Sequence, residues 1–262
     1  SLTTQRIFTV EKDNRITLPV FLEPYGSRFV VFRKPVTGTY FTELSRNGVS
    51  LFPRLPAHTF SGAPVVTLPD GSFYFLSGKK YELKKHTGRK ITLYNYETET
   101  MVIRTPWNVS FDPAWGGPEK TTFERLISWP HHPDKGIRYY SGTAVYENRF
   151  TLTPQQRRRN RVILTLGEVY HVAEVTINGH SAGIWWNAPF EKDVTEHVKS
   201  GVNTLEVKVV NLWPNRLIGD LQLPEEERFT RTNVRKFTKD APLLPSGLLG
   251  PVGLTFRPVK KP

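Results

Sequence analysis

The sequence predicts an all-β fold made of β-sandwiches. Segments of alternating apolar and polar residues recur at intervals of about ten residues, separated by Gly, Pro, Asn and Asp, as in half-buried antiparallel strands. Helical periodicity is nearly absent from the 262 residues. A chain of this length buries a real core without disulfides, and this one has no cysteine, which excludes thiol catalysis and thiolate metal sites.

The predicted strands share a period of two and turn residues at their ends. In chain order they are residues 16–22, 28–32, 72–76, 90–94, 100–103, 143–152, 162–166 and 204–210. In the last of these, Leu205, Val207 and Val209 share one face, while Glu206 and Lys208 between them face solvent. That strand is therefore expected to be half-buried.

Two turn dipeptides predict hairpins. A charge pattern elsewhere predicts one short helix. Asp70-Gly71 and Asn178-Gly179 tolerate the positive φ of tight two-residue turns, so each should join two antiparallel strands. Residues 193–199 begin with an acidic and end with a basic side chain, and Gly201 is available to terminate them. We predict one or two helical turns there.

The strand pattern divides near residues 104–107, after which a loop-rich stretch precedes a second set of strands. We expect two β-rich units, 1–105 and 106–262. The first supplies only about five strands and is expected to be a small or incomplete sandwich.

The net charge of +12 is scattered along the chain. Its densest run, residues 157–161, precedes a predicted strand and is interpreted as a solvated loop tip, the alternative being contact with an acidic polysaccharide or a phosphate backbone. No nucleic-acid-binding motif accompanies it, and no apolar run approaches the roughly 20 residues that cross a bilayer. Neither a nucleic acid nor a membrane is expected as a partner.

Acidic residues offer no recognisable catalytic pair. A glycoside hydrolase needs two carboxyl groups facing each other across the scissile bond, and none of the candidates lies in a motif that predicts such a pair: Glu147, Glu168, Glu174, Asp193 and Asp220. We expect no catalytic residue and no cofactor. Metal binding is left open, because oxygen ligands that suit a structural Ca²⁺ are plentiful.

Clustered aromatic residues are the stronger functional signal. Trp185 and Trp186 are consecutive, so on an extended backbone one should point inward and the other outward. They pack in the core or at a domain interface, or one indole stacks on a sugar face. The other four tryptophans are interpreted first as packing residues.

A second cluster follows the strand at 204–210. Asn215, Arg216 and Asp220 lie in a loop that could close one end of a sandwich, where binding groups usually lie. Their amide, guanidinium and carboxylate can bind sugar hydroxyls, or Arg216 can hold Asp220 structurally. With Trp185 and Trp186 they form the predicted carbohydrate-binding set.

Nine segments between residues 107 and 252, which keep the family's order and approximate spacing, resemble the C-terminal region of the α-L-rhamnosidase-type glycoside hydrolases, family 106. The region also resembles, more distantly, the sugar-binding jelly-roll domain of family 2 glycoside hydrolases. The matching segments are residues 107–118, 123–129, 139–146, 166–167, 175–179, 183–190, 201–205, 215–220 and 244–252, with 24–35 resembling a preceding strand pair.

The resemblance implies a galactose-binding-like jelly roll in residues 106–262. In that family the catalytic glutamates belong to a barrel domain upstream of this region, so no residue here inherits their role. It implies the non-catalytic C-terminal portion of an α-L-rhamnosidase-like hydrolase, with that barrel and carbohydrate as partners and a periplasmic or secreted location. The alternatives are a free-standing carbohydrate-binding module and, less favoured, a polyanion-binding β protein.

Overall fold

The computed structural model describes residues 10–12, 15–18, 27, 29–31, 40–52, 65–67, 72–75, 80–94, 98–158, 160–233 and 236–260. The chain divides into two compact units. The first comprises residues 1–99 with 159–161 and 256–262, and the second comprises residues 100–158 with 162–255. The division at residue 105 expected from the sequence stays a prediction.

The first unit contains short antiparallel strands. Four strands form a sheet in the order β4-β3-β7-β8, and two separate pairs are β1-β2 and β5-β6. The bounds are β1 (Val10–Lys12), β2 (Arg15–Thr17), β3 (Phe41–Arg46), β4 (Val49–Phe52), β5 (Val65–Thr67), β6 (Phe73–Phe75), β7 (Lys80–Lys85) and β8 (Lys90–Tyr94). Its core is a cluster of buried aromatic and aliphatic side chains in which the rings of Phe75 and Tyr81 stack 3.8 Å apart.

Two sequence predictions in this unit have different outcomes. The strand predicted at 90–94 is β8, and β6 lies within the strand predicted at 72–76. The strand predicted at 28–32 is wrong for residues 29–31, which form no strand and leave Phe29 98% exposed. Alternation alone does not make a strand, which also needs a pairing partner, and none of the described residues pairs with 29–31. The Asp70-Gly71 turn lies outside the described residues, although β5 and β6 on either side of it pair antiparallel.

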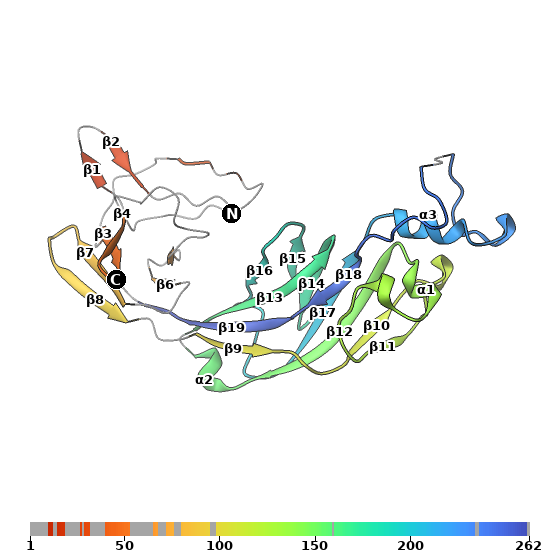
Figure 1. The fold of residues 1–262 in the computed structure, drawn as a ribbon. Helices are drawn as coiled ribbons and strands as arrows, with labels where there is room; N and C mark the ends of the chain where they lie inside the picture. Colours follow the sequence, from red (N-terminus) through yellow and green to blue (C-terminus); the bar gives the residue numbers. More distant parts are fainter. Residues whose placement is uncertain are drawn as a thin grey trace. The chain divides into compact units, whose positions relative to one another are not determined.

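The second unit contains two antiparallel sheets (Figure 1). One has the order β11-β10-β12-β17-β14-β15, and the other has the order β16-β13-β19-β9 with β18 paired to β13. The bounds are β9 (Glu99–Val102), β10 (Trp107–Ser110), β11 (Thr121–Phe123), β12 (Thr143–Leu152), β13 (Asn160–Tyr170), β14 (Val172–Ile177), β15 (His180–Trp185), β16 (Phe190–Asp193), β17 (Gly201–Val210), β18 (Gly247–Gly250) and β19 (Gly253–Pro258). The predicted all-β fold is confirmed.

Alternating side chains build the core of this unit. Leu205, Val207 and Val209 of β17 are buried, as the sequence predicted, and face the same interior as Tyr146 of β12. The Tyr146 hydroxyl accepts hydrogen bonds from Trp129 Nε1 at 2.5 Å and from the backbone N–H of Leu248 in β18 at 3.4 Å, which links the two sheets. Burial raises the pKa of Tyr146, although these two hydrogen bonds lower it.

The Asn178-Gly179 turn is confirmed. It joins β14 to β15, and its φ angles are 52° and 79°, both in the left-handed region that this dipeptide tolerates. The Asn178 side chain also holds the turn against β17, because its Nδ2 donates a hydrogen bond to Asn203 Oδ1 at 2.8 Å. The turn therefore sets the register of β14 against β15.

The helix predicted at 193–199 is wrong. Asp193 ends β16 by pairing with Ile163 of β13, and its carboxylate accepts hydrogen bonds from the N–H and the hydroxyl of Thr195 at 3.0 and 2.6 Å. Strand pairing and this side-chain turn satisfy the backbone locally, so the weak helical charge pattern is overridden.

Short helices lie elsewhere. They are η1 (Pro113–Trp115), η2 (Trp129–His131), α1 (Lys135–Arg138), α2 (Pro154–Arg157), α3 (Pro214–Asp220) and η3 (Glu225–Glu227). The basic run at 157–161 begins in α2, whose start is closed by a capping box between Thr153 and Gln156. None of the helices in the described part of the chain has the length and apolarity that crossing a bilayer requires.

Candidate functional site

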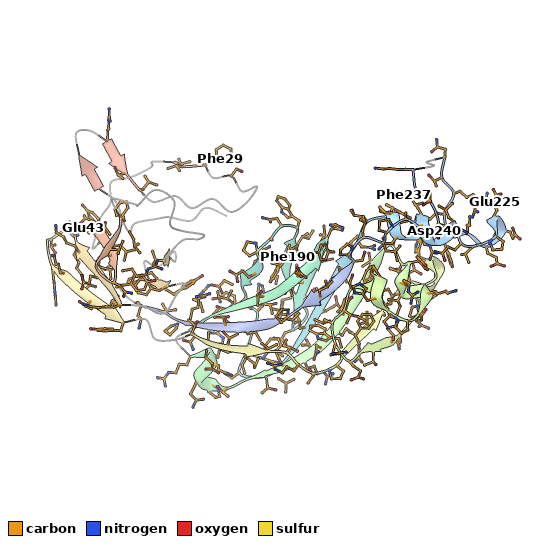
Figure 2. All side chains as sticks on the ribbon, viewed as in Figure 1. Phe29, Glu43, Phe190, Glu225, Phe237 and Asp240 are labelled. Atoms are coloured by element: carbon orange, nitrogen blue, oxygen red, sulfur yellow. The ribbon has the colours of Figure 1, made fainter. Side chains whose placement is uncertain are left out.

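Strand register brings the two predicted clusters to the same end of the six-stranded sheet. Ala173 of β14 pairs with Trp185 on one side and with Val209 on the other. Trp185 therefore lies two strand spacings, about 10 Å, from the last residues of β17. Residues 211–220 follow that strand directly, and Figure 2 shows Glu225 and Asp240 beside α3 at this end of the unit.

The two adjacent tryptophans point to opposite sides, as predicted. Trp185 is 2% exposed and its Nε1 donates to the carbonyl oxygen of Ala182 at 3.2 Å. Trp186 is 60% exposed, as is Ile184 two positions before it. Of this pair, only the Trp186 indole is available to a ligand or a partner surface.

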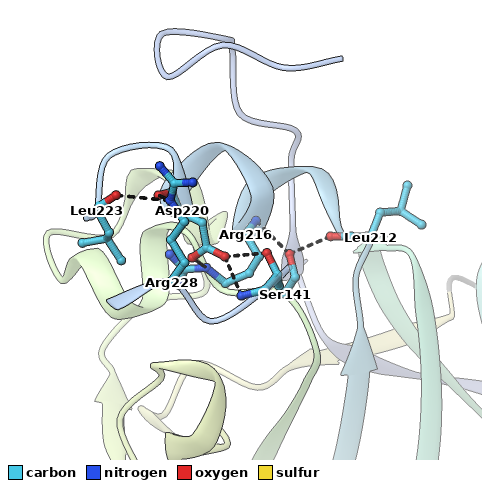
Figure 3. Close-up of polar contacts among 7 residues, drawn as sticks. Ser141, Leu212, Arg216, Asp220, Leu223 and Arg228 are labelled. Carbon is cyan, nitrogen blue, oxygen red and sulfur yellow. Dashed lines mark hydrogen bonds and ion pairs between the residues drawn. The ribbon is translucent and has the colours of Figure 1, made fainter. Parts of the chain in front are cut away.

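The residues predicted as a loop form helix α3 instead, and a buried ion pair lies within it (Figure 3). Arg216 Nε and Asp220 Oδ1 are 2.9 Å apart, with 4% and 5% of the two side chains exposed. The spacing of four residues places both groups on one helix face. Burial lowers the pKa of Arg216, and the Asp220 carboxylate opposes that change.

Asp220 also holds the segment after α3. Its Oδ2 accepts hydrogen bonds from the N–H of Thr230 at 2.8 Å and from the Thr230 hydroxyl at 2.5 Å. Arg228 Nε donates to the Asp220 carbonyl oxygen at 2.9 Å (Figure 3). The guanidinium of Arg216 lies 4.6 Å from the centre of the Phe229 ring. Arg216 and Asp220 thus both contact residues 228–230, through side chains and through the Asp220 backbone.

Asn215 anchors α3 on its other side. Its Nδ2 donates to the Leu244 carbonyl oxygen at 2.8 Å and to Ser246 Oγ at 3.0 Å, and its Oδ1 accepts from the Leu244 N–H at 2.8 Å. Asn215, Arg216 and Asp220 are each at most 3% exposed. Their polar groups have partners within the chain, so they position α3. Direct contact of these three side chains with a sugar stays a prediction.

An open hollow lies beside α3. Its volume is about 370 Å³, and it is lined by Trp115, Trp213, Leu217, Phe229, Thr230, Arg231 and Thr232. The Trp115 and Trp213 rings meet edge to face at 5.4 Å, and Trp213 is 53% exposed. We name it the aromatic hollow.

Gly116 explains how Phe229 reaches this position. A Cβ at Gly116 would lie 2.6 Å from the tip of the Phe229 ring, and its φ is +79°. A glycine is therefore required here by backbone conformation and by the close approach of the ring.

Most of this lining escaped the sequence prediction. Trp213 lies within the predicted loop, and Trp115 lies in the loop-rich stretch after residue 107, but both were interpreted as packing residues. Phe229 and Arg231 lie in a segment without periodicity or turn motif. Nothing in the sequence indicates that loops about a hundred residues apart meet at one sheet end.

The hollow can bind but offers little chemistry. Exposed aromatic faces stack on the apolar C–H face of a sugar, and Arg231 supplies hydrogen-bond donors. Among the described residues, no three His, Cys, Asp or Glu side chains are grouped so that they could hold a metal ion.

Comparisons with known proteins agree with this architecture. Residues 133–241 match the model of a family described as "Glycosyl hydrolase 2 galactose-binding domain-like". The chain carries a galactose-binding-like domain. That domain includes α3, its buried ion pair and most of the aromatic hollow, and it is related to glycoside hydrolases.

Two larger proteins share more of the chain. A Formosa agariphila protein named "Putative beta-glucuronidase" is 36% identical over 216 residues, which is 72% of this chain and 19% of that protein. The structure of a rhamnosidase from Novosphingobium sp. PP1Y has a TM-score of 0.56 and 26% identity, covering 76% of this chain and 24% of that one. The chain thus spans about a fifth to a quarter of these relatives. A β-glucuronidase from Ruminococcus gnavus is 24% identical over 45% of this chain and 23% of its own, with a TM-score of 0.38.

Proposed function

We propose that the chain is an accessory, non-catalytic portion of an α-L-rhamnosidase-like glycoside hydrolase, which supports the catalytic domain and contributes to carbohydrate recognition. The observation that carries the proposal is the fold shared with the Novosphingobium rhamnosidase across three quarters of this chain. The name of the Formosa relative supports a β-glucuronidase-like parent as the alternative enzyme.

The proposed sugar contact is the aromatic hollow. Trp213 offers an exposed indole face, and Trp115 meets it edge to face. A pyranose ring has an apolar C–H face that matches an indole, and its hydroxyls find donors on the surrounding loop. Trp185, Asn215, Arg216 and Asp220 then act indirectly, as residues that hold this end of the domain together.

The proposed contact with the catalytic domain is a different surface. Ile184 on β15 and Trp186, the residue directly after β15, are large apolar side chains, both 60% exposed, at the edge of the six-stranded sheet. Exposed apolar residues beside an unpaired strand edge are typical of surfaces that another domain covers. We infer that this edge packs against the catalytic barrel.

A free-standing carbohydrate-binding module is the second candidate. It is favoured by the aromatic hollow, whose seven lining residues all belong to the second unit of this chain. The intact mass of the native gene product distinguishes the candidates. A mass that includes a barrel-sized domain supports the hydrolase, and a mass near 30.1 kDa supports the module.

The purified chain should not hydrolyse aryl α-L-rhamnosides or aryl β-glucuronides. Glu147 and Glu168 are exposed on strands, Asp220 is held in an ion pair, and no carboxylate is among the seven residues that line the hollow, whereas a glycoside hydrolase needs two across the scissile bond. Release of nitrophenol is the measurement, against a buffer blank. Turnover that disappears when one of these three residues is substituted would refute a non-catalytic role.

The chain should bind L-rhamnose or methyl α-L-rhamnoside weakly, and Trp213→Ala should remove most of that binding. The lost interaction is stacking on the exposed indole, which is worth about 1 kcal/mol or more beyond its buried area. Isothermal titration at millimolar sugar measures it. Trp186→Ala is the matched control, because that indole is 60% exposed against 53% for Trp213 and directly follows β15, outside the lining of the hollow. Loss with Trp186→Ala and retention with Trp213→Ala would move the sugar site to β15.

A further inference from the structure

We propose that the aromatic hollow binds the charged unit of an acidic saccharide, with Arg231 pairing to its carboxylate or sulfate. The inference rests on the carbohydrate-binding role proposed above and adds the class of sugar. Two observations support it: the charge of the residues that line the hollow, and the contacts that the arginines near α3 make within the chain.

The lining has one charge. Of the seven residues that form the hollow, Arg231 is a cation and none is an anion. Arg231 is exposed and forms no ion pair with any residue that the structure describes. An exposed guanidinium in a concave aromatic site has donors that can bind a ligand.

The neighbouring arginines are already engaged. Arg216 is buried against Asp220 and stacks on Phe229. Arg228 uses its Nε to bind the carbonyl oxygens of Asp220 and Leu223 at 2.9 and 3.2 Å. These two cations hold the loop in place, whereas Arg231, three residues further on, has no such structural partner among the residues that the structure describes.

The nearest run of acidic residues in sequence does not enter the hollow. Glu225, Glu226 and Glu227 form η3, are exposed, and are absent from the lining. A carboxylate there screens little of the attraction at Arg231, because exposed charges interact weakly through water. The hollow therefore keeps a positive character.

The two groups of the hollow match the two faces of an acidic sugar. A uronic acid or a sugar sulfate has an apolar C–H face for the Trp213 indole and an anionic group at the ring periphery. The planar guanidinium fork of Arg231 can bind a carboxylate or sulfate with two parallel hydrogen bonds. At about 370 Å³ the hollow lies near the lower end of the size range of ligand pockets, which suits one or two sugar units.

The test is a titration of the full chain with sodium D-glucuronate, D-galactose 6-sulfate and L-rhamnose at about 0.15 M salt, where the Debye length is about 8 Å. We expect one or both charged sugars to bind at least about tenfold more tightly than L-rhamnose, as a charge-assisted hydrogen bond allows. Arg231→Gln should remove this preference, weakening binding of the charged sugars by about tenfold and binding of L-rhamnose by clearly less, because a neutral sugar loses only an uncharged hydrogen bond.

Arg149→Gln is the matched control for total charge. Arg149 is exposed on β12, towards the end of the strand that lies away from residue 143 and the hollow. If Arg149→Gln weakens binding of the charged sugars as much as Arg231→Gln does, the attraction comes from the net charge of +12 and the assignment of Arg231 fails.

The remaining outcomes separate this inference from the proposed function. Equal affinity for charged and neutral sugars, all lost with Trp213→Ala, overturns the acidic-sugar assignment and leaves carbohydrate binding in place. Absence of binding by all three sugars overturns both binding claims, and the accessory role is then judged by the intact mass alone. Preference for glucuronate over the sulfate identifies a carboxylate as the recognised group.

Discussion

Asp220→Ala should lower the free energy of unfolding of the second unit by about 3–5 kcal/mol, because it leaves the Arg216 guanidinium buried without its counter-ion. The change also removes both hydrogen bonds from Thr230 to Asp220 Oδ2. Denaturant unfolding followed by tryptophan fluorescence measures the loss.

An exposed pair in the same unit supplies the control for Asp220→Ala. Lys208 Nζ and Glu206 Oε1 are 3.6 Å apart, with 40% and 35% of the side chains exposed. Glu206→Gln should cost about 1 kcal/mol or less, since water screens both charges. Similar small losses for the two variants would show that Arg216 reaches solvent without its partner. The double variant Arg216→Met with Asp220→Leu should recover part of the stability, because it leaves no charge buried.

Gly167→Ala should destabilise the same unit by about 3 kcal/mol or more, because the new methyl group meets backbone. A Cβ at Gly167 would lie 2.2 Å from the carbonyl carbon and oxygen of Gly250 and 2.6 Å from the nitrogen of Pro251. Gly167 also has a φ of +66° at an irregularity of β13, where the strand meets β16 and β18. The thermal midpoint reports the effect.

Gly179→Ala is the matched control for Gly167→Ala. Its φ is +79°, but nothing lies within 4 Å of the added Cβ. It should cost only the left-handed conformation, about 1–2 kcal/mol. The difference between the two variants measures the close approach of β13 to Gly250. Equal losses would mean that the sheets separate to accept the methyl group.

The strands were the predictable part of the fold. Leu205, Val207 and Val209 alternate with polar residues, and a strand with one buried face requires that alternation. Asn178 and Gly179 were predictable because few dipeptides tolerate two positive φ angles in succession. These signals depend only on residues close together in the chain, so they can be recognised in a single sequence.

The sequence placed residues 211–220 after a strand at one end of the domain, but it did not predict helix α3. That helix depends on tertiary partners, with the Asn215 side chain bound to the Leu244 carbonyl oxygen and the Arg216 backbone N–H bound to Ser141 Oγ. The side chains with the most recognisable sugar-binding chemistry are buried and contact partners within the chain: Arg216 pairs with Asp220, and Asn215 bonds to Leu244 and Ser246. The exposed lining comes from loops near residues 115, 213 and 230, whose meeting is set by the sheet and not by spacing in the chain.

The link from Asp220 to Thr230 has a thermodynamic consequence for recognition. A loop that is already fixed before a ligand arrives has little conformational freedom left to lose, so the entropic penalty of ordering Phe229 and its neighbours falls on folding and not on binding. The proposed sugar site would in this sense be a rigid receptor, whose affinity depends on the contacts that a sugar makes with surfaces already in place. Evolution of a new sugar preference at this site would then require exchange of the side chains at the rim, such as Arg231, while the buried ion pair beneath them is kept.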